Sequence, residues 1–502
     1  MKYSIVLMEN EGFFGLACNE GIKMPFTRES KFSLDLREWH SGNQASSVLV
    51  SSKGRYIYSL KPFKFDIENG VITLEGEDIV IKRNGNSLKE AYQGLKNDFF
   101  KLDHKIPNPL MFEKPQYNTW IEMGWDCTEE KVIKYAKSII KHGYPAGVLM
   151  IDDCWCKDYG VWDFDREKFP HPHETIKTLH DMGFVVMLWI CPFVSLDSPV
   201  FREIENKGIL FKNKDGSTAV SHWWNGYSGV IDLYKKEGRD FLISKLDFLQ
   251  KEYDIDGFKL DAADPDYYHD FFEFNGVNKS YQAQEYAALG ERYDFSELRV
   301  AFNNNLRGVA HRLRDKNHSW DYDGLNTLIP DGICEGLLGY PYFCPDMIGG
   351  GMLLDFQRED FKFDEELYVR YAEASSLLPM MQFSLLPYKI LSEENQKIVL
   401  DMVKLHVKYK DVILSLVEEA RTSGEMIIRS MNYVFNKDEY LFINDQFMLG
   451  DSIMVAPQLK KGNRREVVIP EGSWVDELGN KYEEGVYEIE VPLSRLPVFT
   501  RV

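Results

Sequence analysis

The chain has 502 residues, more than one hydrophobic core usually organises, so we expect two to four domains. Its formal net charge is −20, and an acidic surface repels phosphate backbones, which argues against nucleic acid as a partner. Apolar runs are too short to span a bilayer, so we expect no membrane partner. Seven cysteines match no disulfide framework, and the first eight residues resemble a strand rather than a signal segment, so we expect a cytoplasmic location.

The first part of the chain has the pattern of short strands. β-Branched and aromatic runs are separated by turn residues, which is typical of antiparallel sheets. The runs are Ser47–Ser51, Arg55–Leu60, Val71–Glu75 and Asp78–Lys82. No helical period appears before the stretch from Ser87 to Leu102. We therefore predict an N-terminal β-sandwich over residues 1–112.

From about Asn118, strand-like runs alternate with amphipathic helical segments, which indicates repeated β/α units. The predicted strands are Trp120–Trp125, Gly147–Ile151, Val185–Ile190, Gly257–Asp261, Leu298–Asn303, Val309–Arg314, Tyr340–Phe343 and Met381–Phe383. The helical segments include Glu129–His142, His173–Met182, Gly238–Glu252 and Tyr281–Tyr293. This number of strands over about 270 residues matches one (β/α)8 TIM barrel, which we assign to residues 113–422. An insert at residues 193–236 is longer than a plain β/α loop.

The last part of the chain returns to short strands after a long helical stretch, Glu393–Ser423. The predicted strands are Tyr440–Ile443, Ser452–Ala456, Glu466–Ile469, Val486–Val491 and Val498–Val502. Turn signals containing glycine separate them. We predict a C-terminal β domain over residues 423–502, in a protein of the α/β class.

Acidic residues follow four of the predicted barrel strands. Asp152 and Asp153 end the second strand, Asp261 the fourth, Asp315 the sixth and Asp346 the seventh. One aspartate after a strand is often only a helix N-cap or an Asx turn. Four such sites at one rim favour a polar ligand, because a charged ring at a barrel mouth is otherwise costly. Catalytic groups of such barrels also sit at the C-terminal ends of the strands.

Tryptophans at strand ends indicate the kind of ligand. They are Trp125, Trp155, Trp162, Trp189, Trp223, Trp224 and Trp320. Indole faces stack on the apolar faces of sugar rings, and core packing is expected to account for two or three of these residues. A phosphate ester would call for glycine loops or Lys/Arg clusters, and the chain has no P-loop. We therefore predict a carbohydrate site.

Hydrolysis of a glycosidic bond needs two carboxyl groups, one that stays ionised and one that carries a proton. Lys259 lies two residues before Asp261 in one strand, so both side chains face the same side and the ammonium favours the carboxylate. Asp261 therefore suits a nucleophile, although a purely structural Lys–Asp pair would have the same spacing. Asp315 is the candidate proton donor, and its rivals are Asp321 and Asp323. The C-x-C pair Cys154 and Cys156 is too tight for a zinc site, so we expect no metal.

These motifs resemble glycoside hydrolase family 31 over most of the chain. The run Gly257–Asp261 looks like the nucleophile strand of the family. Arg314-Asp315 with Trp320 looks like its acid/base segment, in which the family normally has glycine at the position of Arg314. Further matches are Leu337–Pro341, Pro345–Gly350, Gly450–Pro457 and Leu496–Phe499.

Within the family, the resemblance is closer to an α-galactosidase-like branch. The matching motifs are Asp152-Asp153, Tyr159–Asp165, Lys168–Pro170, Trp223–Gly226, Val230–Asp232 and Leu325–Pro330. Lys259 stands where α-glucosidase members carry tryptophan, and Met381–Ser384 lacks their histidine. The resemblance implies that Asp261 is the nucleophile and Asp315 the general acid/base. It implies substrate binding by Asp152, Asp153, Trp224, Lys259, Arg299 and Asp346, and we add Trp189, which ends a predicted strand, to this set.

The expected function is that of a retaining, exo-acting α-glycosidase, first of all an α-galactosidase, without a metal or organic cofactor. An α-glucosidase, an α-xylosidase or another α-glycosidase of the family is the alternative. A second alternative is an inactive barrel that only binds sugar. The expected partner is a small saccharide or glycoside, and assembly into a homo-oligomer stays open.

Overall fold

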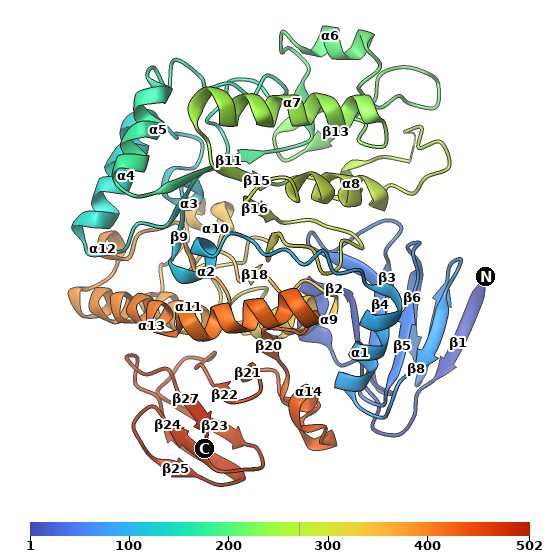
Figure 1. Ribbon diagram of the computed structural model, residues 1–502, viewed down its shortest axis with the longest axis vertical. Helices are drawn as coiled ribbons and strands as arrows, with labels where there is room; N and C mark the ends of the chain where they lie inside the picture. The colour runs from blue at the N-terminus through green and yellow to red at the C-terminus, as the bar shows by residue number, and fades with distance from the viewer. Residues whose placement is uncertain (271) are drawn as a thin grey trace.

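The computed structural model describes residues 1–270 and 272–502 and consists of an N-terminal β-sandwich, a central barrel and a C-terminal β domain (Figure 1). In Figure 1 the sandwich lies beside the barrel, and the C-terminal domain lies below the long helix α13 (Glu393–Ser423). The predicted fold class, a (β/α)8 barrel with a β-sandwich before it and a β domain after it, is confirmed.

Two antiparallel sheets form the N-terminal sandwich. One has the order β1 (Lys2–Val6), β7 (Val71–Glu75), β6 (Lys64–Glu68) and β3 (Phe32–Asp35). The other has the order β2 (Phe13–Ala17), β4 (Ala45–Ser51), β5 (Arg55–Tyr58) and β8 (Val80–Arg83). Helix α1 (Leu88–Phe99) follows and begins at Ser87, whose hydroxyl accepts a hydrogen bond from the backbone N–H of Glu90. It packs against β4 and β5.

Parallel strands in chain order form the barrel. They are β9 (Gln116–Asn118), β10 (Val148–Ile151), β11 (Val185–Ile190), β15 (Gly257–Leu260), β16 (Phe295–Leu298), β17 (Ala310–Arg312), β18 (Phe343–Cys344) and β19 (Gln382–Phe383). β19 pairs with β9, and the backbone N–H of Ile348 donates to the carbonyl of Gln382 at 2.8 Å beyond the end of β18. This bond closes the ring. Covering helices include α4 (Glu129–Lys141), α5 (Pro172–Asp181), α7 (Lys236–Tyr253), α8 (Ser280–Gly290), α9 (Leu328–Leu337) and α11 (Glu365–Ser375).

The strands with continuous apolar sequence were the easy ones to predict. All four residues of β10, Val-Leu-Met-Ile, are buried, as expected of a parallel strand covered on both faces. The prediction of a strand at Trp120–Trp125 is wrong, because Trp120–Met123 is a helix, α3, and the strand is β9 before it. The Asn118 side chain accepts from the backbone N–H of Trp120 at 2.8 Å and turns the chain there.

Polar residues inside the barrel explain that error. The Gln382 amide donates to Gln116 of the neighbouring strand β9 at 3.2 Å and to Glu297 of β16, across the barrel, at 2.8 Å. Buried polar groups inside the barrel thus find partners on other strands. A strand such as Gln-Tyr-Asn carries no apolar run for a sequence pattern to detect. Its identity as a strand depends on partners that are far away in the chain.

The predicted insert forms its own small sheet beside the barrel mouth. It contains β12 (Phe193–Ser195), α6 (Phe201–Asn206), β13 (Val220–Trp223) and β14 (Gly226–Val230), paired antiparallel in the order β12-β14-β13. The tight turn between β13 and β14 carries Trp224. At the same mouth lie α3 and a second short helix, α10 (Leu353–Gln357), which contact each other.

The C-terminal domain has one larger sheet and one two-stranded sheet. The larger sheet has the order β20 (Ile428–Arg429), β21 (Phe447–Leu449), β22 (Ile453–Val455), β27 (Val498–Arg501), β24 (Trp474–Asp476) and β25 (Lys481–Tyr482). The other pairs β23 (Arg464–Ile469) with β26 (Gly485–Glu490). The predicted strand at Tyr440–Ile443 is wrong, because Asp438–Tyr440 is a 3₁₀ turn with Tyr440 N–H bonded to the Lys437 carbonyl.

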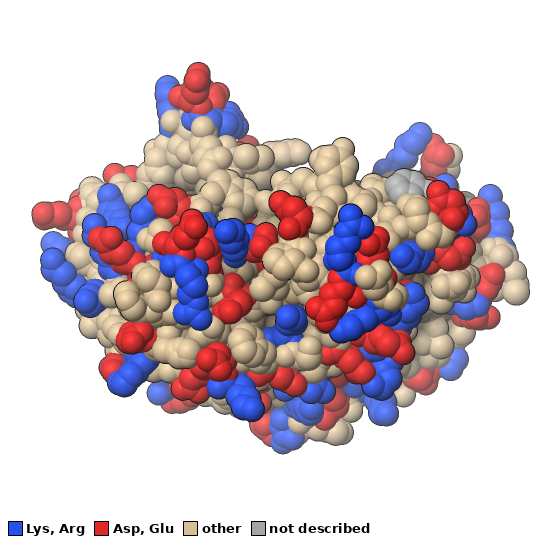
Figure 2. Space-filling model, turned by 90° about the horizontal axis from the view of Figure 1, so that it is seen from above, with Lys and Arg blue, Asp and Glu red and all other residues tan. Residues whose placement is uncertain are grey.

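The surface mixes charges of both signs. In Figure 2 acidic and basic side chains are interspersed over the face shown and do not gather into a basic patch. Within the described part of the chain, no helix combines the length and the apolar character that crossing a bilayer requires.

Candidate active site

A cavity of about 650 Å³ opens at the C-terminal ends of the barrel strands. Its lining comes from the N-terminal sandwich, the insert, β11 and the segments at the ends of β9, β10, β15, β16, β17 and β18. Charged residues of the lining are Asp152, Asp153, Lys259, Asp261, Asp264, Asp266, Arg299, Arg314, Asp315 and Asp323. Its aromatic residues are Trp39, Trp120, Trp125, Trp189, Trp224, Tyr267 and Tyr322. A cavity of this volume admits one or two sugar rings.

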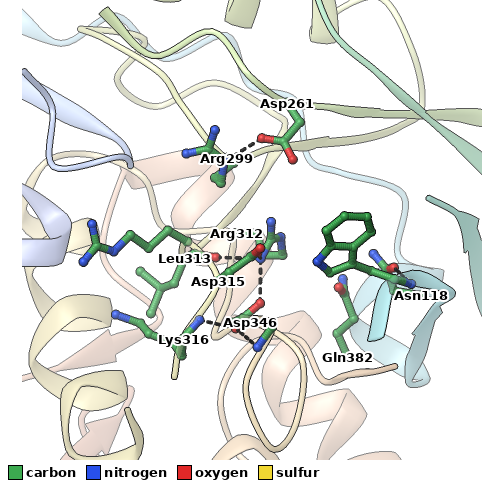
Figure 3. A network of polar contacts seen from close by, with 12 residues as sticks. Asn118, Asp261, Arg299, Arg312, Leu313, Asp315, Lys316, Asp346 and Gln382 are labelled. Atoms are coloured by element: carbon green, nitrogen blue, oxygen red, sulfur yellow. Dashed lines mark hydrogen bonds and ion pairs between the residues drawn. The ribbon is translucent and has the colours of Figure 1, made fainter. Parts of the chain in front are cut away.

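Asp261 lies on the floor of this cavity, directly after β15. Arg299 Nε donates to one carboxylate oxygen at 2.5 Å (Figure 3). The Trp189 indole N–H donates to the other oxygen at 3.1 Å. Burial alone would raise the pKa of Asp261. The positive charges of Arg299, Lys259 and Arg312 outweigh burial and hold this pKa well below its usual range. These charges therefore favour the ionised form of Asp261.

Arg299 is held by several elements at once. Its Nη1 and Nη2 atoms donate to Asp264 at 2.9 and 2.5 Å, and Nη1 also donates to the carbonyl of Gly42 at 2.7 Å. The guanidinium lies over the ring of Trp224, 5.6 Å from its centre. Most of its donors are thus used within the protein. Asp264, which the sequence did not single out, fixes the arginine that orients Asp261.

Lys259 occupies the floor as well, but its direct partner is not Asp261. Its ammonium lies 2.7 Å from Asp152, and both side chains are buried. Asp153 beside them accepts hydrogen bonds from Tyr159 at 2.9 Å and from Asn225 at 2.7 Å. Burial raises the pKa of Asp153 to about 6, and those two hydrogen bonds limit the rise. The floor therefore presents a fixed ammonium and several acceptors for hydroxyl groups.

Asp315 lies beyond the end of β17 and is the more open of the two candidate acids. Arg312 Nη1 donates to Asp315 at 2.9 Å and to Asp346 at 2.6 Å (Figure 3). Arg312 Nε lies 3.3 Å from Glu297. The Asp315 side chain is 30% exposed, whereas that of Arg312 is fully buried. One arginine is thus shared among three carboxyl groups.

Asp346 does not line the cavity, unlike the other predicted binding residues. It is fully buried behind Arg312, and its second oxygen accepts from the backbone N–H groups of Lys316 and Gly351 at 2.7 and 2.9 Å. Burial raises the pKa of Asp346 to about 7, with Arg312 opposing the rise and Asp315 adding to it. Its position can affect a ligand only through Arg312 and the backbone.

The rivals of Asp315 are placed differently. Asp321 is exposed and lies outside the lining. Asp323 lines the cavity but binds Arg314 at 2.5 Å and the buried ammonium of Lys316 at 2.8 Å. Arg314, which stands where the family normally has glycine, is therefore neutralised by a neighbour that also lines the cavity.

The predicted tryptophans divide into two groups. Trp125, Trp189 and Trp224 line the cavity, whereas Trp155, Trp162 and Trp223 are core residues. The indole N–H of Trp320 donates to Asp364 at 3.1 Å, away from the lining. Trp39 and Trp120 line the cavity and were missed. Trp39 belongs to the N-terminal part of the chain, where no pattern connects it with the barrel.

A loop of the N-terminal sandwich completes the cavity rim. The Asn43 side chain donates to the carbonyls of Arg299 and Arg312 at 3.1 and 3.0 Å, and accepts from the N–H of Arg314 at 2.8 Å. Gln44 donates to the carbonyls of Leu298 and Arg312 at 3.0 and 3.1 Å. Because β16 and β17 diverge here, the loop takes over the hydrogen bonds that a longer pair of strands would have made.

A barrel with a closed, acid-lined cavity at this end is the architecture of many sugar-cleaving enzymes, and the family comparison makes the class specific. Residues 109–407 match the glycosyl hydrolases family 31 TIM-barrel domain, and residues 424–502 match the glycosyl hydrolase family 31 C-terminal domain. The chain belongs to glycoside hydrolase family 31.

Individual relatives differ in their activities. The chain is 31% identical to the myogenesis-regulating glycosidase of Mus musculus, over 83% of this chain and 60% of that protein. It is 24% identical to an α-xylosidase of Saccharolobus solfataricus, over 83% of this chain and 58% of that protein. The chain therefore spans less than two thirds of the length of these curated relatives.

The fold recurs in solved structures at low identity. A family 31 sulfoquinovosidase from E. rectale, in complex with an aza-sugar inhibitor, superposes with a TM-score of 0.85 at 16% identity, covering 100% of this chain and 82% of that chain. A dextranase of Flavobacterium johnsoniae, complexed with glucose, gives a TM-score of 0.83 at 20% identity, covering 100% of this chain and 66% of that chain. Both comparisons support the fold.

Proposed function

We propose that this protein is a retaining, exo-acting α-glycosidase and that its sugar is α-galactose. Asp261 is the nucleophile and Asp315 the general acid/base. The observation that carries the proposal is that both carboxyl groups line one cavity while their surroundings differ. Asp261 is buried among positive charges, and Asp315 is partly exposed and shares its arginine with Asp346.

The chemistry proceeds in two displacements. In the first, Asp261 attacks the anomeric carbon while Asp315 gives its proton to the leaving oxygen, so that a covalent glycosyl ester forms and the aglycone departs. In the second, Asp315 takes a proton from water, which attacks the same carbon and releases Asp261. Two inversions restore the original configuration.

The floor of the cavity supports an exo mode of action. Lys259, Asp152 and Asp153 are fixed donors and acceptors at its closed end, suited to the hydroxyl groups of one terminal ring. Arg299 and Trp189 hold the nucleophile at the side of that ring. An enzyme that cleaves inside a longer saccharide chain would need a cavity that continues beyond these residues.

The choice of galactose depends on the resemblance to the galactosidase-like branch, above all on Lys259 before the nucleophile. Xylose and glucose are the alternative sugars, because curated relatives are named α-xylosidase and α-glucosidase. A panel of nitrophenyl α-galactoside, α-glucoside and α-xyloside, assayed with purified protein, tests the choice. Galactoside turnover at least tenfold above the others supports it, and a glucoside or xyloside preference contradicts it.

The stereochemical course tests the mechanism separately from the sugar. Proton NMR of the first product should detect the α-anomer before mutarotation. A β-anomer as first product would mean an inverting enzyme and would remove Asp261 from the role of nucleophile.

The second candidate function is sugar binding without catalysis. It predicts a measurable heat of binding for galactose and no turnover of any glycoside between pH 4 and 9. Free galactose bound without any hydrolysis in the panel would favour this candidate.

We also propose a cytoplasmic location. All seven cysteines are free, and six of them are buried, which fits a reducing compartment. Recovery of the protein with the periplasmic or secreted fraction of its host would contradict this.

A further inference from the structure

One side of the cavity is apolar, unlike its floor. We call it the α3–α10 wall and define it by Trp120, Trp125, Met352, Leu353 and Leu354, all of which line the cavity. None of these side chains carries a charge. The remaining rim contains Arg314, Asp323 and Asp266 instead.

Two short helices from distant parts of the chain build this wall. α3 and α10 contact each other, and Leu353 is buried with Ile121 and Met347. The rings of Trp120 and Trp125 pack edge to face, with 5.2 Å between their centres. The wall is therefore preformed and has its own apolar support.

Two of its side chains remain uncovered. Leu354 is 68% exposed and Trp125 is 45% exposed. Leaving a leucine and an indole in water at a cavity mouth is unfavourable unless a ligand covers them, and such patches commonly mark binding sites.

The wall lies on the side of the proposed proton donor. The backbone N–H of Met352 donates to the carbonyl of Lys316, the residue after Asp315, at 3.0 Å. The N–H of His318 donates to Asp355 of α10 at 3.0 Å. Since the donor must touch the leaving oxygen, the group attached to that oxygen begins next to this wall.

A sugar in that position would need hydrogen-bond partners for its hydroxyl groups, because hydroxyls buried without partners are costly. The five wall residues offer only the indole N–H groups of the two tryptophans, and Gln357, the last residue of α10, adds one amide to the lining. An alkyl or aryl group needs none and gains from contact with leucine, methionine and indole.

We propose that the α3–α10 wall is an aglycone site that takes an apolar alkyl or aryl group. The inference rests on the proposed function and specifies its substrate class as α-glycosides with apolar aglycones. Cleavage follows the two displacements above, with the alcohol leaving after it receives the proton of Asp315.

A series of substrates with similar leaving-group acidity tests the proposal. We would compare kcat/KM for methyl and hexyl α-glycosides, and for a disaccharide, of the sugar that the panel selects. The expected result is a kcat/KM about tenfold higher for the hexyl than for the methyl glycoside. Equal values for hexyl and methyl, or a disaccharide preferred over the hexyl glycoside, would overturn the inference.

Variants of the wall residues test whether the wall causes the preference for the hexyl glycoside. Leu354→Ser should lower the hexyl-to-methyl ratio of kcat/KM about fivefold, and Trp125→Ser should lower it similarly. Leu478→Ser is the matched control, because Leu478 is 65% exposed and belongs to the C-terminal domain. An unchanged ratio in both wall variants would contradict the proposal.

A binding measurement separates this inference from the proposed function. Calorimetry with Asp261→Ala needs no turnover and should give about tenfold tighter binding of the hexyl than of the methyl glycoside. If no glycoside is hydrolysed by the wild type but this preference holds, the proposed function fails and the aglycone site stands. If hydrolysis occurs without any preference, the aglycone site fails alone.

Discussion

An aspartate on one side of the cavity has different surroundings from an aspartate on the other side. On one side Asp261 is 9% exposed, lies 2.5 Å from Arg299 and experiences the charge of Lys259. On the other side Asp315 is 30% exposed and shares Arg312 with two further carboxyl groups. The charges of Arg299, Lys259 and Arg312 outweigh the effect of burial on the pKa of the first acid, whereas a single arginine faces three carboxyl groups at the second.

Two aspartates at one barrel rim can therefore differ in chemical behaviour because their surroundings differ. In the proposed mechanism the nucleophile must stay ionised, which the cations near Asp261 favour. The proposed proton donor must reach the leaving oxygen, and Asp315 is partly exposed while Arg312 fixes its orientation. Variants that change one side of the cavity at a time separate the two environments.

The largest effect is expected from removing the acids themselves. Asp261→Ala should lower kcat for every substrate by about 10⁴-fold or more, because no covalent intermediate can form. Asp315→Ala should lower kcat/KM about 10³-fold for alkyl glycosides but much less for nitrophenyl glycosides, whose leaving group needs no proton. Steady-state kinetics with both substrate types measures this contrast.

Azide provides the control for that assignment. With Asp315→Ala, azide should restore turnover and give an α-glycosyl azide, because it replaces water in the second displacement. With Asp261→Ala, a β-glycosyl azide is expected after a single displacement. Hydrolysis of the alkyl glycosides within about threefold of wild type in either alanine variant would exclude the role of that acid.

The next largest effect concerns the cation beside the nucleophile. Arg299→Met should lower kcat/KM about 10²-fold and the free energy of unfolding by about 3 kcal/mol, because Asp261 and Asp264 lose a buried partner. Arg299 holds the pKa of Asp261 down, so its loss raises that pKa. Since the carboxylate form reacts, the acid limb of the pH–kcat/KM profile should move to higher pH.

Arg299→Lys is the matched control. It keeps the charge but loses the bidentate contact with Asp264, so the acid limb should move less than in Arg299→Met. An identical pH profile for wild type and Arg299→Met would mean that Arg299 does not govern the ionisation of Asp261.

A smaller effect on the same side is expected from Lys259→Met. The change leaves Asp152 buried without its ammonium partner and removes a donor from the floor. We expect KM to rise about 30-fold, with a smaller loss in kcat, because binding of the terminal ring suffers first. The double variant Lys259→Met/Asp152→Asn should recover part of the stability but not the binding. A change in kcat alone would contradict a binding role.

The smallest effect should come from the loop that joins the two sides. Asn43→Ala removes the bonds to the carbonyls of Arg299 and Arg312, one on each side of the cavity. We expect kcat to fall about tenfold. The free energy of unfolding should decrease by about 2 kcal/mol, measured as a lower midpoint of urea unfolding. Asn86→Ala, on the exposed loop before α1, is the control. An unchanged kcat would mean that the loop of the sandwich does not position the residues of the site.

Much of the fold followed from pattern. The long helix was predicted with its observed bounds, Glu393–Ser423, because its apolar period is regular and Gly424 in a left-handed conformation ends it. The apolar strands β10, β11 and β15 were predicted within one residue at either end for the same kind of reason. β9 and β19 were displaced or shortened, because polar residues such as Gln116 and Gln382 find their partners only across the closed barrel.

The candidate site divides in the same way. Asp152, Asp153, Lys259 and Asp261 directly follow or belong to strongly apolar strands, so their position at the rim could be predicted. Asp264 and Trp39 could not, since neither lies at a strand end. Asp346 has the spacing of a rim acid, yet the glycine-rich turn after it leads the side chain behind Arg312 instead of into the cavity.

By itself, the sequence determined the order of domains, the barrel and which aspartates follow its apolar strands, because apolar periodicity and strand-end position are local properties of the chain. Only the tertiary structure decided which cation serves which acid and which side of the cavity is apolar. Arg299 meets Asp261, and α3 meets α10, across 38 and more than 200 residues of chain. Contacts over such separations are set by ring closure of the barrel and by docking of the sandwich, which no local pattern encodes.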